Sequence, residues 1–246
     1  MNASEQAHVS AARVPAPSDV LPLDAPAIPD YLERHYAWAY LRPRNVRRLD
    51  RLAVLQTILF GNYRRLCDAA RRALAPGPRH RVLQVGCAYG DLTPRLARDV
   101  APGHLEVVDV AALQLEQLRR KLPEDDTTRL RHEDACDLAV PDGSFDRVLL
   151  FFLLHELPPE SQRRALAEAL RVCRPDGRVV IVDYARPPAL HPLRWVLTPL
   201  FTRLEPFAKG FWGRAIAELL PEGFAGSVAP ERRWFGGLYR EVTLRP

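Results

Sequence analysis

The sequence predicts an α/β fold, a doubly wound parallel sheet with helices on both faces. The first observation is the stretch Arg81–Leu96, RVLQVGCAYGDLTPRL, in which an apolar run of strand length leads through a glycine turn into residues with helical spacing. The second is that apolar runs alternate with amphipathic helical patterns from there on, as in parallel sheets. The third is size, because 246 residues with 47% hydrophobic content allow one sizeable core.

The core elements follow Arg81 in regular order. We expect the strands Arg81–Val85, His104–Val108, Thr128–His132, Arg147–Leu153 and Arg178–Asp183, and the helices Leu92–Val100, Leu113–Lys121 and Ser161–Cys173, the last stopped by a turn at Pro175–Gly177. Near the end, Arg232–Phe235 and Leu238–Leu244 flank Gly236-Gly237. This pattern predicts a closing β-hairpin, because two glycines suit a tight turn.

Three segments lie outside this alternation. Residues 1–28 are rich in Ala, Pro and Ser without periodicity, which predicts a disordered tail. Residues 29–78 predict an N-terminal helical cap, which precedes a domain formed by residues 79–246. Residues 187–221 predict a helical insertion after the fifth strand. The helices expected in the cap are Pro29–Tyr40, Arg44–Phe60 and Tyr63–Leu74.

The cap and the insertion both combine aromatic with basic residues. Two interpretations of the cap stay open: it packs on the core only, or its helices lie on a membrane surface or cover an apolar substrate. For the insertion we favour a lid over an ordinary packed helical pair, because it is as aromatic as the cap.

Composition narrows the setting. The four cysteines are scattered without CxxC or Cys/His spacing, so we expect neither a disulfide framework nor a zinc site, and a reducing cytoplasmic location. We see no signal-peptide pattern and no run of the ~20 apolar residues that span a bilayer. The net charge of +5 comes almost wholly from arginine. An anionic partner would explain it, but so would GC-rich coding, which also explains the abundant Ala and Pro.

The glycine turn is the first functional signal. Gly86 and Gly90 would let the backbone approach a ligand, and the following helix start would offer unpaired N–H groups. The signal is weak by itself, since only two glycines stand where a dinucleotide fingerprint has three.

Several ordered pieces of Arg81–Pro246 together resemble the class I S-adenosylmethionine (SAM) methyltransferases. These pieces are VLQVGCAYG, Asp109 at the end of the second strand, EDACDLAVPDGSFDRVLLFFLLHEL, LAEALRVCRPDGRVVIVDY and the glycine hairpin. The resemblance implies a seven-stranded Rossmann-like sheet whose last strand is antiparallel, and SAM as co-substrate.

The resemblance also implies a cofactor site. Asp109 would take the ribose hydroxyls with its two acceptor oxygens, although a surface-turn aspartate is the plain alternative. Asp134 beside Ala135 would hold the adenine amino group, although a helix-capping role is open. The residues expected to bind SAM are Gln84, Gly86, Gly90, Asp109, Val110, Asp134 and Ala135.

Three positions depart from the superfamily. Ala88 stands where a third glycine is usual. Gln84 stands where an acidic residue commonly holds the methionine amino group, and Tyr89 stands where a small residue is usual. Tyr89 would therefore project a phenol near the cofactor, unless it serves packing alone.

A narrower resemblance covers the chain from Ile28 nearly to its end. The pieces IPDYLERHYAWAY, VLQVGCAYGDLTPRLA, DRVLLFFLLHEL, VDYARPPALHPLR and RLEPFA resemble the rhodoquinone-biosynthesis protein family (RquA). This resemblance implies that SAM donates its amino group, which replaces a ring methoxy group of ubiquinone and gives rhodoquinone. It also implies a divalent metal, manganese, and peripheral association with the inner membrane, where the quinone resides.

Polar residues expected at the carboxyl edge of the sheet are the candidates for chemistry. Catalysis would fall to Tyr89, His155 and Asp91, with Asp183 nearby, and a hard metal would be bound by His155 and Glu156. The plain alternatives are a structural role for His155 and a helix-capping role for Asp91.

Competing functions remain. A conventional C- or O-methyltransferase of a quinone precursor is the first alternative. We do not expect a nucleic-acid methyltransferase, because FFLLHEL stands where an Asn-Pro-Pro-Tyr type motif would follow the fourth strand. A non-catalytic SAM-binding partner protein is the third class.

Overall fold

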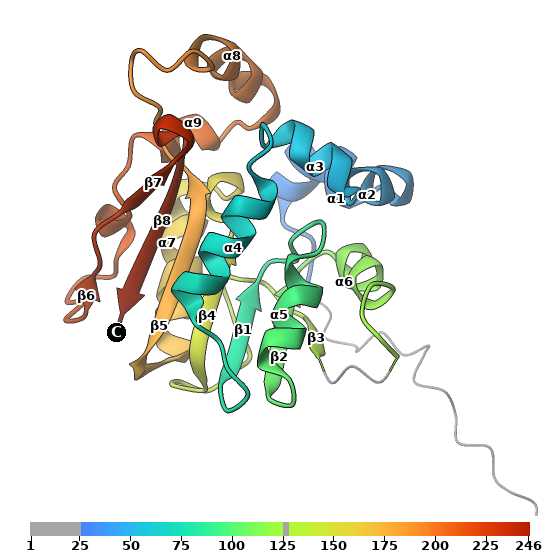
Figure 1. Cartoon of the computed structure of the whole chain (residues 1–246), viewed down its shortest axis with the longest axis vertical. Coiled ribbons are helices and arrows are strands. Elements are labelled where there is room, and N and C mark those ends of the chain that lie inside the picture. Colours follow the sequence, from blue (N-terminus) through green and yellow to red (C-terminus); the bar gives the residue numbers. More distant parts are fainter. Residues whose placement is uncertain (1–25, 125–127) are drawn as a thin grey trace, which may run out of the picture.

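The computed structural model describes residues 26–124 and 128–246, so the tail prediction for residues 1–25 lies outside the described part. Five strands pair in parallel: β1 (Arg81–Val85), β2 (His104–Asp109), β3 (Arg129–His132), β4 (Phe145–Phe151) and β5 (Cys173–Tyr184). The strand β8 (Tyr239–Arg245) pairs antiparallel with β5. The predicted α/β fold with an antiparallel last strand is confirmed (Figure 1).

The described sheet has eight strands where seven were predicted, in the order β3-β2-β1-β4-β5-β8-β6. Beyond β8 the edge is built by two short strands, β6 (Ser227–Val228) and β7 (Arg232–Trp234), which both pair with β8. The predicted hairpin is therefore present as β7 and β8. Its connection is a 3₁₀ turn at Phe235–Gly237, in which both glycines have positive φ.

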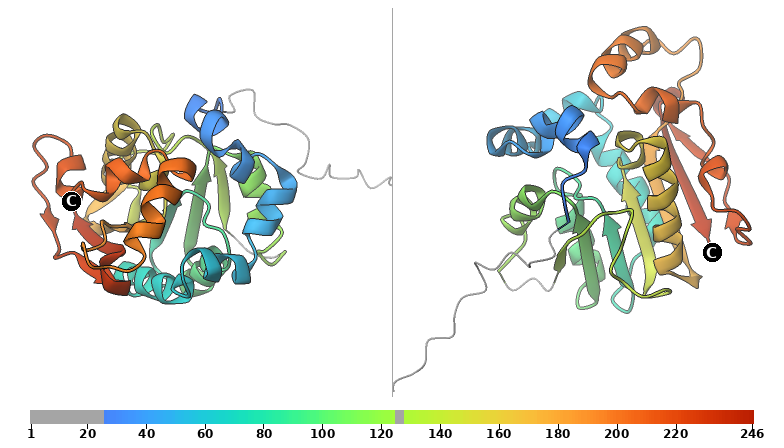
Figure 2. Two further views of the ribbon diagram at one scale, coloured as in Figure 1. Left: turned by 90° about the horizontal axis from the view of Figure 1, so that it is seen from above. Right: turned by 180° about the vertical axis from the view of Figure 1, so that it is seen from behind.

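Helices cover both faces of the sheet. One face packs against α4 (Tyr63–Leu74) and α5 (Leu92–Val100), and the other against α7 (Pro159–Val172), as Figures 1 and 2 show. The helix α6 (Ala112–Arg119) follows β2. These helices match the predicted ones within two residues at each end, because each presents a regular apolar face to the sheet.

Two predicted boundaries around β4 and β5 were wrong. The strand expected to reach Leu153 ends at Phe151, because Phe152 has a left-handed backbone with φ 53°. The turn expected at Pro175–Gly177 lies within β5 instead. The pairing of β4 with β5 shifts register between Phe145 and Arg147 of β4, and Pro175 lies in this irregular part of the ladder.

The N-terminal helices differ from prediction at one point. Instead of one helix over Arg44–Phe60, the chain forms α2 (Pro43–Leu49) and α3 (Leu52–Ile58), with a break at Asp50 and Arg51. Before them, a π-helical turn at Leu32–Tyr36 leads into α1 (Ala37–Tyr40). The break places the Asp50 side chain against the glycine turn, as described below.

The insertion after β5 contains α8 (Arg194–Leu204), α9 (Ala208–Trp212) and a 3₁₀ turn at Ile216–Leu219. The N-terminal helices and this insertion both lie over the carboxyl end of the sheet, and α8 projects furthest from it (Figures 1 and 2). Tyr31 and Phe207 join the two segments in an edge-to-face ring contact. Among the described residues, no helix has the length and apolar character needed to cross a bilayer.

Candidate functional site

A small cavity lies where β1, β2 and β4 end. Its volume is about 70 Å³, far below the ~300–1,000 Å³ of typical ligand pockets. Its lining comes from two sources: the strand ends, and the N-terminal segment that covers them. The lining residues are Gly86, Cys87, Asp109, Val110, Ala111, Phe151, Phe152, Leu153, Glu156 and Leu157 from the core, and Tyr31, Leu32 and Tyr40 from the N-terminal segment.

Asp109 is held in this cavity by backbone donors. The Cys87 N–H donates to Oδ2 over 2.7 Å and the Ala111 N–H to Oδ1 over 2.8 Å. Burial raises the pKa of Asp109 to about 6, although these hydrogen bonds oppose the shift. Each oxygen keeps a second lone pair, so the oriented carboxylate can still accept ligand hydroxyls.

The two glycines of the turn both have φ of +83°, but they are crowded by different neighbours. A Cβ on Gly86 would lie 3.2 Å from Leu153 Cδ1. A Cβ on Gly90 would lie 2.3 Å from the Tyr63 hydroxyl and 2.6 Å from Leu55 Cδ1. Gly90 is therefore required by the packing of the N-terminal helices.

The expectation of unpaired N–H groups at the start of α5 was wrong. Gly90 N–H donates to Asp50 Oδ1 over 2.7 Å, and the N–H groups of Asp91 and Leu92 donate to the Tyr63 hydroxyl over 2.8 and 3.1 Å. Lys121 Nζ completes this hydrogen-bond network by donating to Asp50 Oδ1 and to the Gly90 carbonyl. Side chains from the N-terminal helices thus cap α5.

Gln84 and Asp91 lie beside this hydrogen-bond network. The fully buried Gln84 donates from Nε2 to the Gly86 carbonyl over 2.9 Å and accepts from the Thr93 hydroxyl over 2.9 Å. Asp91 makes no side-chain cap, and its buried Oδ1 has no hydrogen-bond partner among the described residues. Its charge adds to burial in raising the pKa of the Cys67 thiol on α4, so Asp91 lies next to that helix.

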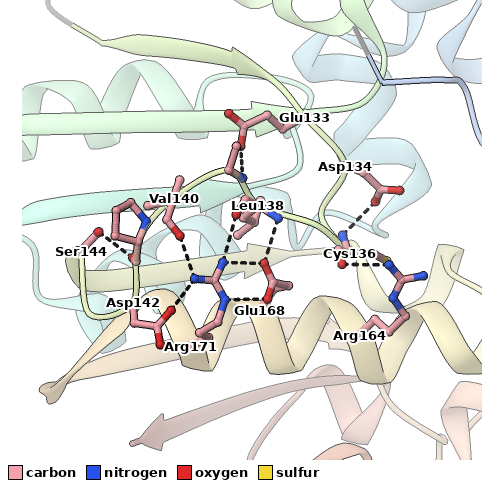
Figure 3. A network of polar contacts seen from close by, with 12 residues as sticks. Glu133, Asp134, Cys136, Leu138, Val140, Asp142, Ser144, Arg164, Glu168 and Arg171 are labelled. Atoms are coloured by element: carbon pink, nitrogen blue, oxygen red, sulfur yellow. Dashed lines mark hydrogen bonds and ion pairs between the residues drawn. The ribbon is translucent and has the colours of Figure 1, made fainter. Parts of the chain in front are cut away.

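Asp134 and Ala135 lie in the loop between β3 and β4. The Cys136 N–H donates to Asp134 Oδ1 over 2.8 Å. Figure 3 shows how arginines of α7 fix this loop: Arg171 donates to the carbonyls of Val140 and Leu138, and Arg164 to that of Cys136. Neither Asp134 nor Ala135 lines the small cavity. Burial and the Asp134 charge raise the pKa of Tyr31, which therefore lies close to this loop.

A buried polar cluster lies next to the cavity, after β4. His155 Nδ1 is 2.7 Å from Asp183 Oδ1 at the end of β5, and both side chains are buried. His155 Nε2 lies 3.9 Å from Glu156 Oε1. Burial lowers the pKa of His155, but the Asp183 carboxylate more than offsets it, so the pKa rises to about 9. Burial raises the pKa of Glu156 to about 8.

Two tyrosines from the N-terminal segment donate hydrogen bonds to acidic side chains at this cluster, Glu156 and Glu205. The Tyr40 hydroxyl donates to Glu156, and the Tyr36 hydroxyl donates to Glu205 Oε2 over 2.8 Å. Burial raises the pKa of Glu205, which lies between α8 and α9. Sequence reasoning missed Glu205 and the tyrosines, because no spacing pattern joins segments so far apart in the chain.

Tyr89 is engaged on both sides of its hydroxyl. It donates to the Ala39 carbonyl over 2.8 Å and accepts from Gln114 Nε2 over 2.7 Å. Its ring stacks on Tyr40 with centroids 5.7 Å apart. Tyr89 therefore joins the glycine turn to the residue that contacts Glu156.

The residues present do not fit the expected metal site. His155 and Glu156 provide two ligands, and no group of three or more His, Cys, Asp or Glu side chains within the described ranges could hold a metal ion. His155 Nδ1 and Glu156 Oε1 are already engaged by Asp183 and Tyr40.

Comparisons with known proteins agree with this fold. Residues 82–177 match the family model described as a methyltransferase domain. The chain is 38% identical over 120 residues to the demethylmenaquinone methyltransferase of Clavibacter sepedonicus, covering 49% of this chain and 47% of that protein. It is 35% identical over 133 residues to the enzyme of the same name from Lactiplantibacillus plantarum, covering 50% and 55%. The chain thus spans about half the length of these curated relatives.

Solved structures show the same architecture. Magnesium protoporphyrin IX methyltransferase from Synechocystis, with bound SAH, superposes with a TM-score of 0.59 at 14% identity, covering 87% of this chain and 99% of that one. The 1,6-didemethyltoxoflavin-N1-methyltransferase from Burkholderia thailandensis superposes with a TM-score of 0.54 at 18% identity, covering 91% and 93%. At such identities the likeness shows the fold.

The crowding at Gly90 gives a stability prediction. Gly90→Ala should lower the free energy of unfolding by about 2 kcal/mol or more, because it combines a left-handed backbone with a clash against Tyr63. Urea unfolding measures this. Gly210→Ala is the control, since nothing lies within 4 Å of its Cβ position and its φ is not positive. Equal stability of the two variants would contradict the packing role of Gly90.

Proposed function

We propose that this chain is a class I SAM-dependent methyltransferase and that it transfers a methyl group from SAM to a quinone precursor. The observation that carries this proposal is the buried His155–Asp183 pair beside the Asp109 cavity. The names of the two demethylmenaquinone methyltransferases that it resembles support a quinone substrate.

Methyl transfer requires a group that accepts a proton from the substrate, and the His155–Asp183 pair would provide it. As the sulfonium methyl carbon forms a bond to a ring oxygen or carbon, its bond to sulfur breaks and a substrate proton must leave. Asp183 accepts a hydrogen bond from the Nδ1–H of His155. Because the pKa of His155 is about 9, Nε2 takes the substrate proton in the deprotonated fraction of the enzyme, which grows as the pH rises toward 9. We assign no step to Asp91, which lies against α4, and a positioning role to Tyr89.

SAM would lie along the turn and Asp109. Asp109 and Val110 would contact the ribose, Asp134 and Ala135 the adenine, and the turn from Gly86 to Gly90 the methionine part, with Gln84 behind it. Because the cavity holds only about 70 Å³, Tyr31, Leu32 and Tyr40 would have to move when SAM enters. The N-terminal segment would then close over the bound cofactor.

A second candidate is amino transfer from SAM to ubiquinone, giving rhodoquinone. The observation that favours it is Gln84, a neutral amide already bound to Gly86 and Thr93. With no acid at this position, the SAM amino group is not held as an ammonium ion, so it can act as a nucleophile. Its nitrogen would bond to the ring carbon while methoxide leaves and takes the amine proton as methanol. Elimination would then break the N–Cα bond: a proton leaves Cβ, the nitrogen keeps the bonding electron pair and takes up a proton, and the remnant of SAM departs as an α,β-unsaturated acid.

The substrate class also implies a location. Quinones reside in the bilayer, so we propose peripheral association with the cytoplasmic face of the inner membrane. Support comes from three exposed apolar side chains, Ile58 in α3, Leu190 in the segment before α8 and Trp195 in α8. The helices α3 and α8 both lie at the carboxyl end of the sheet (Figure 1).

Labelled SAM distinguishes the two reactions. SAM with a heavy methyl group and a heavy amino nitrogen would be incubated with ubiquinone or a demethylated precursor, with and without manganese. For methyl transfer, the precursor gains the heavy methyl group in the mass spectrum. For amino transfer, ubiquinone loses a methoxy group and gains heavy nitrogen. If neither quinone changes, both proposals fail.

The role of His155 is tested separately. His155→Gln and Asp183→Asn should lower kcat by roughly 10²–10⁴-fold, because the proton acceptor or its orientation is lost. SAM affinity by calorimetry should stay within about twofold, since neither side chain lines the cofactor cavity. His104→Gln, an exposed change at the opposite end of the sheet, controls for general effects. Unchanged kcat in His155→Gln would remove the residue from the mechanism.

SAM affinity should depend on pH through Asp109. Its pKa of about 6 means that the ionised carboxylate predominates above pH 7, whereas protonation below pH 6 removes acceptor capacity. We expect Kd to rise by up to about tenfold per pH unit below pH 6. Asp109→Asn should bind about 10–100-fold more weakly and lose this dependence.

The control for this measurement is Asp99→Asn, because Asp99 pairs with Arg71 away from the cavity. This variant should keep both the affinity and its pH dependence. A wild-type Kd that stays flat between pH 5 and pH 7 would contradict the role of Asp109.

A further inference from the structure

A second cavity lies in the insertion, and it shares no lining residue with the Asp109 cavity. Its volume is about 280 Å³, and it lies between the chain that leaves β5 and the helices α8 and α9. Its lining combines three cations with small and apolar residues and includes no carboxylate. The lining residues are Arg186, Pro187, Arg194, Thr198, Lys209, Trp212 and Gly213.

The three cations of this cavity are not neutralised within the described chain. Arg186, Arg194 and Lys209 form no ion pair with any described residue, whereas Arg71 and Lys121, for example, do. Three like charges around one concavity repel one another, so they favour an anion that lies between them.

The backbone around the cavity is fixed by hydrogen bonds. Arg186 N–H donates to the Trp212 carbonyl over 3.2 Å, and the Arg233 guanidinium donates to the Arg186 carbonyl over 3.2 Å. On α8, the Thr198 hydroxyl donates to the Arg194 carbonyl over 2.7 Å. The first two bonds join the chain after β5 to α9 and to β7, and the third lies within α8.

Two large apolar side chains beside the cavity are almost fully exposed to solvent. Leu190 is 96% exposed, and Trp195, next to Arg194 on α8, is 80% exposed. The helix α8 projects from the carboxyl end of the sheet (Figure 1). Tryptophan and leucine beside cations are typical of surfaces that enter the headgroup layer of a bilayer.

We propose that this cavity binds the phosphate group of a membrane phospholipid, with Trp195 and Leu190 inserted beside it. The proposal rests on the membrane association proposed above and assigns that association a site. A lipid accounts for both features at once: its phosphate matches the cations, and its acyl region covers the exposed side chains. A free phosphate would leave Leu190 and Trp195 in water.

Vesicle flotation tests the site. Wild type should float with phosphatidylcholine vesicles that contain about one third phosphatidylglycerol. Arg194→Gln with Lys209→Gln should weaken this binding at least about tenfold, since each cation near an anionic surface contributes ~1 kcal/mol. Trp195→Ala should weaken binding to the same vesicles as well.

The matched control removes two charges at the same end of the molecule. Arg47→Gln with Arg48→Gln on α2 leaves the cavity intact and should weaken binding less than about threefold. Equal losses in both double variants would show a general electrostatic attraction and overturn the proposed site. Circular dichroism and thermal melting check that all variants are folded.

A second arm separates lipid from free phosphate. Thermal shifts of wild type and of Arg194→Gln/Lys209→Gln would be measured with inorganic phosphate and with monomeric short-chain phosphatidylglycerol. Stabilisation of wild type by the lipid alone supports the proposal, whereas equal stabilisation by inorganic phosphate overturns the lipid assignment. Quinone turnover in detergent does not depend on lipid binding at this cavity. If turnover is absent while the wild type floats and the cavity variants float less, the proposed function fails and the lipid proposal stands.

Discussion

The capping of α5 by side chains from the N-terminal helices is the interaction on which the rest of this structure depends. The first N–H groups of a helix need acceptors, and here Asp50 and Tyr63 provide them. This requirement explains why the helix predicted over Arg44–Phe60 breaks at Asp50, and why residue 90 is a glycine. The N-terminal helices are thereby bound to the glycine turn itself.

Periodicity predicted the core elements well, because a strand or helix that packs on one sheet shows its buried face in its own sequence. The ranges of β1 and α5 match the prediction, and β2 ends at Asp109 as expected. Failures occurred where a distant side chain decides the local structure. Asp50 breaks a helix for a partner forty residues away, and Glu205 enters the polar cluster through Tyr36. Local spacing contains neither fact.

The Asp109 cavity and the polar cluster are connected through one short segment. Tyr40 lines the cavity, stacks on Tyr89 of the glycine turn, and donates to Glu156. Tyr36, one helical turn earlier, binds Glu205 of the insertion. Tyr36 and Tyr40 therefore join the glycine turn, Glu156 and the insertion through one segment of the chain.

The position of β8 has a consequence for how the chain is made. Residues 239–245 form an interior strand, bordered by β5 on one side and by β6 and β7 on the other. During synthesis the parallel half of the sheet can assemble first, but β6 and β7 have no strand to pair with until β8 has left the ribosome. The β6 and β7 edge of the sheet, and the hydrogen bond from Arg233 of β7 to the Arg186 carbonyl, therefore form only when β8 is in place.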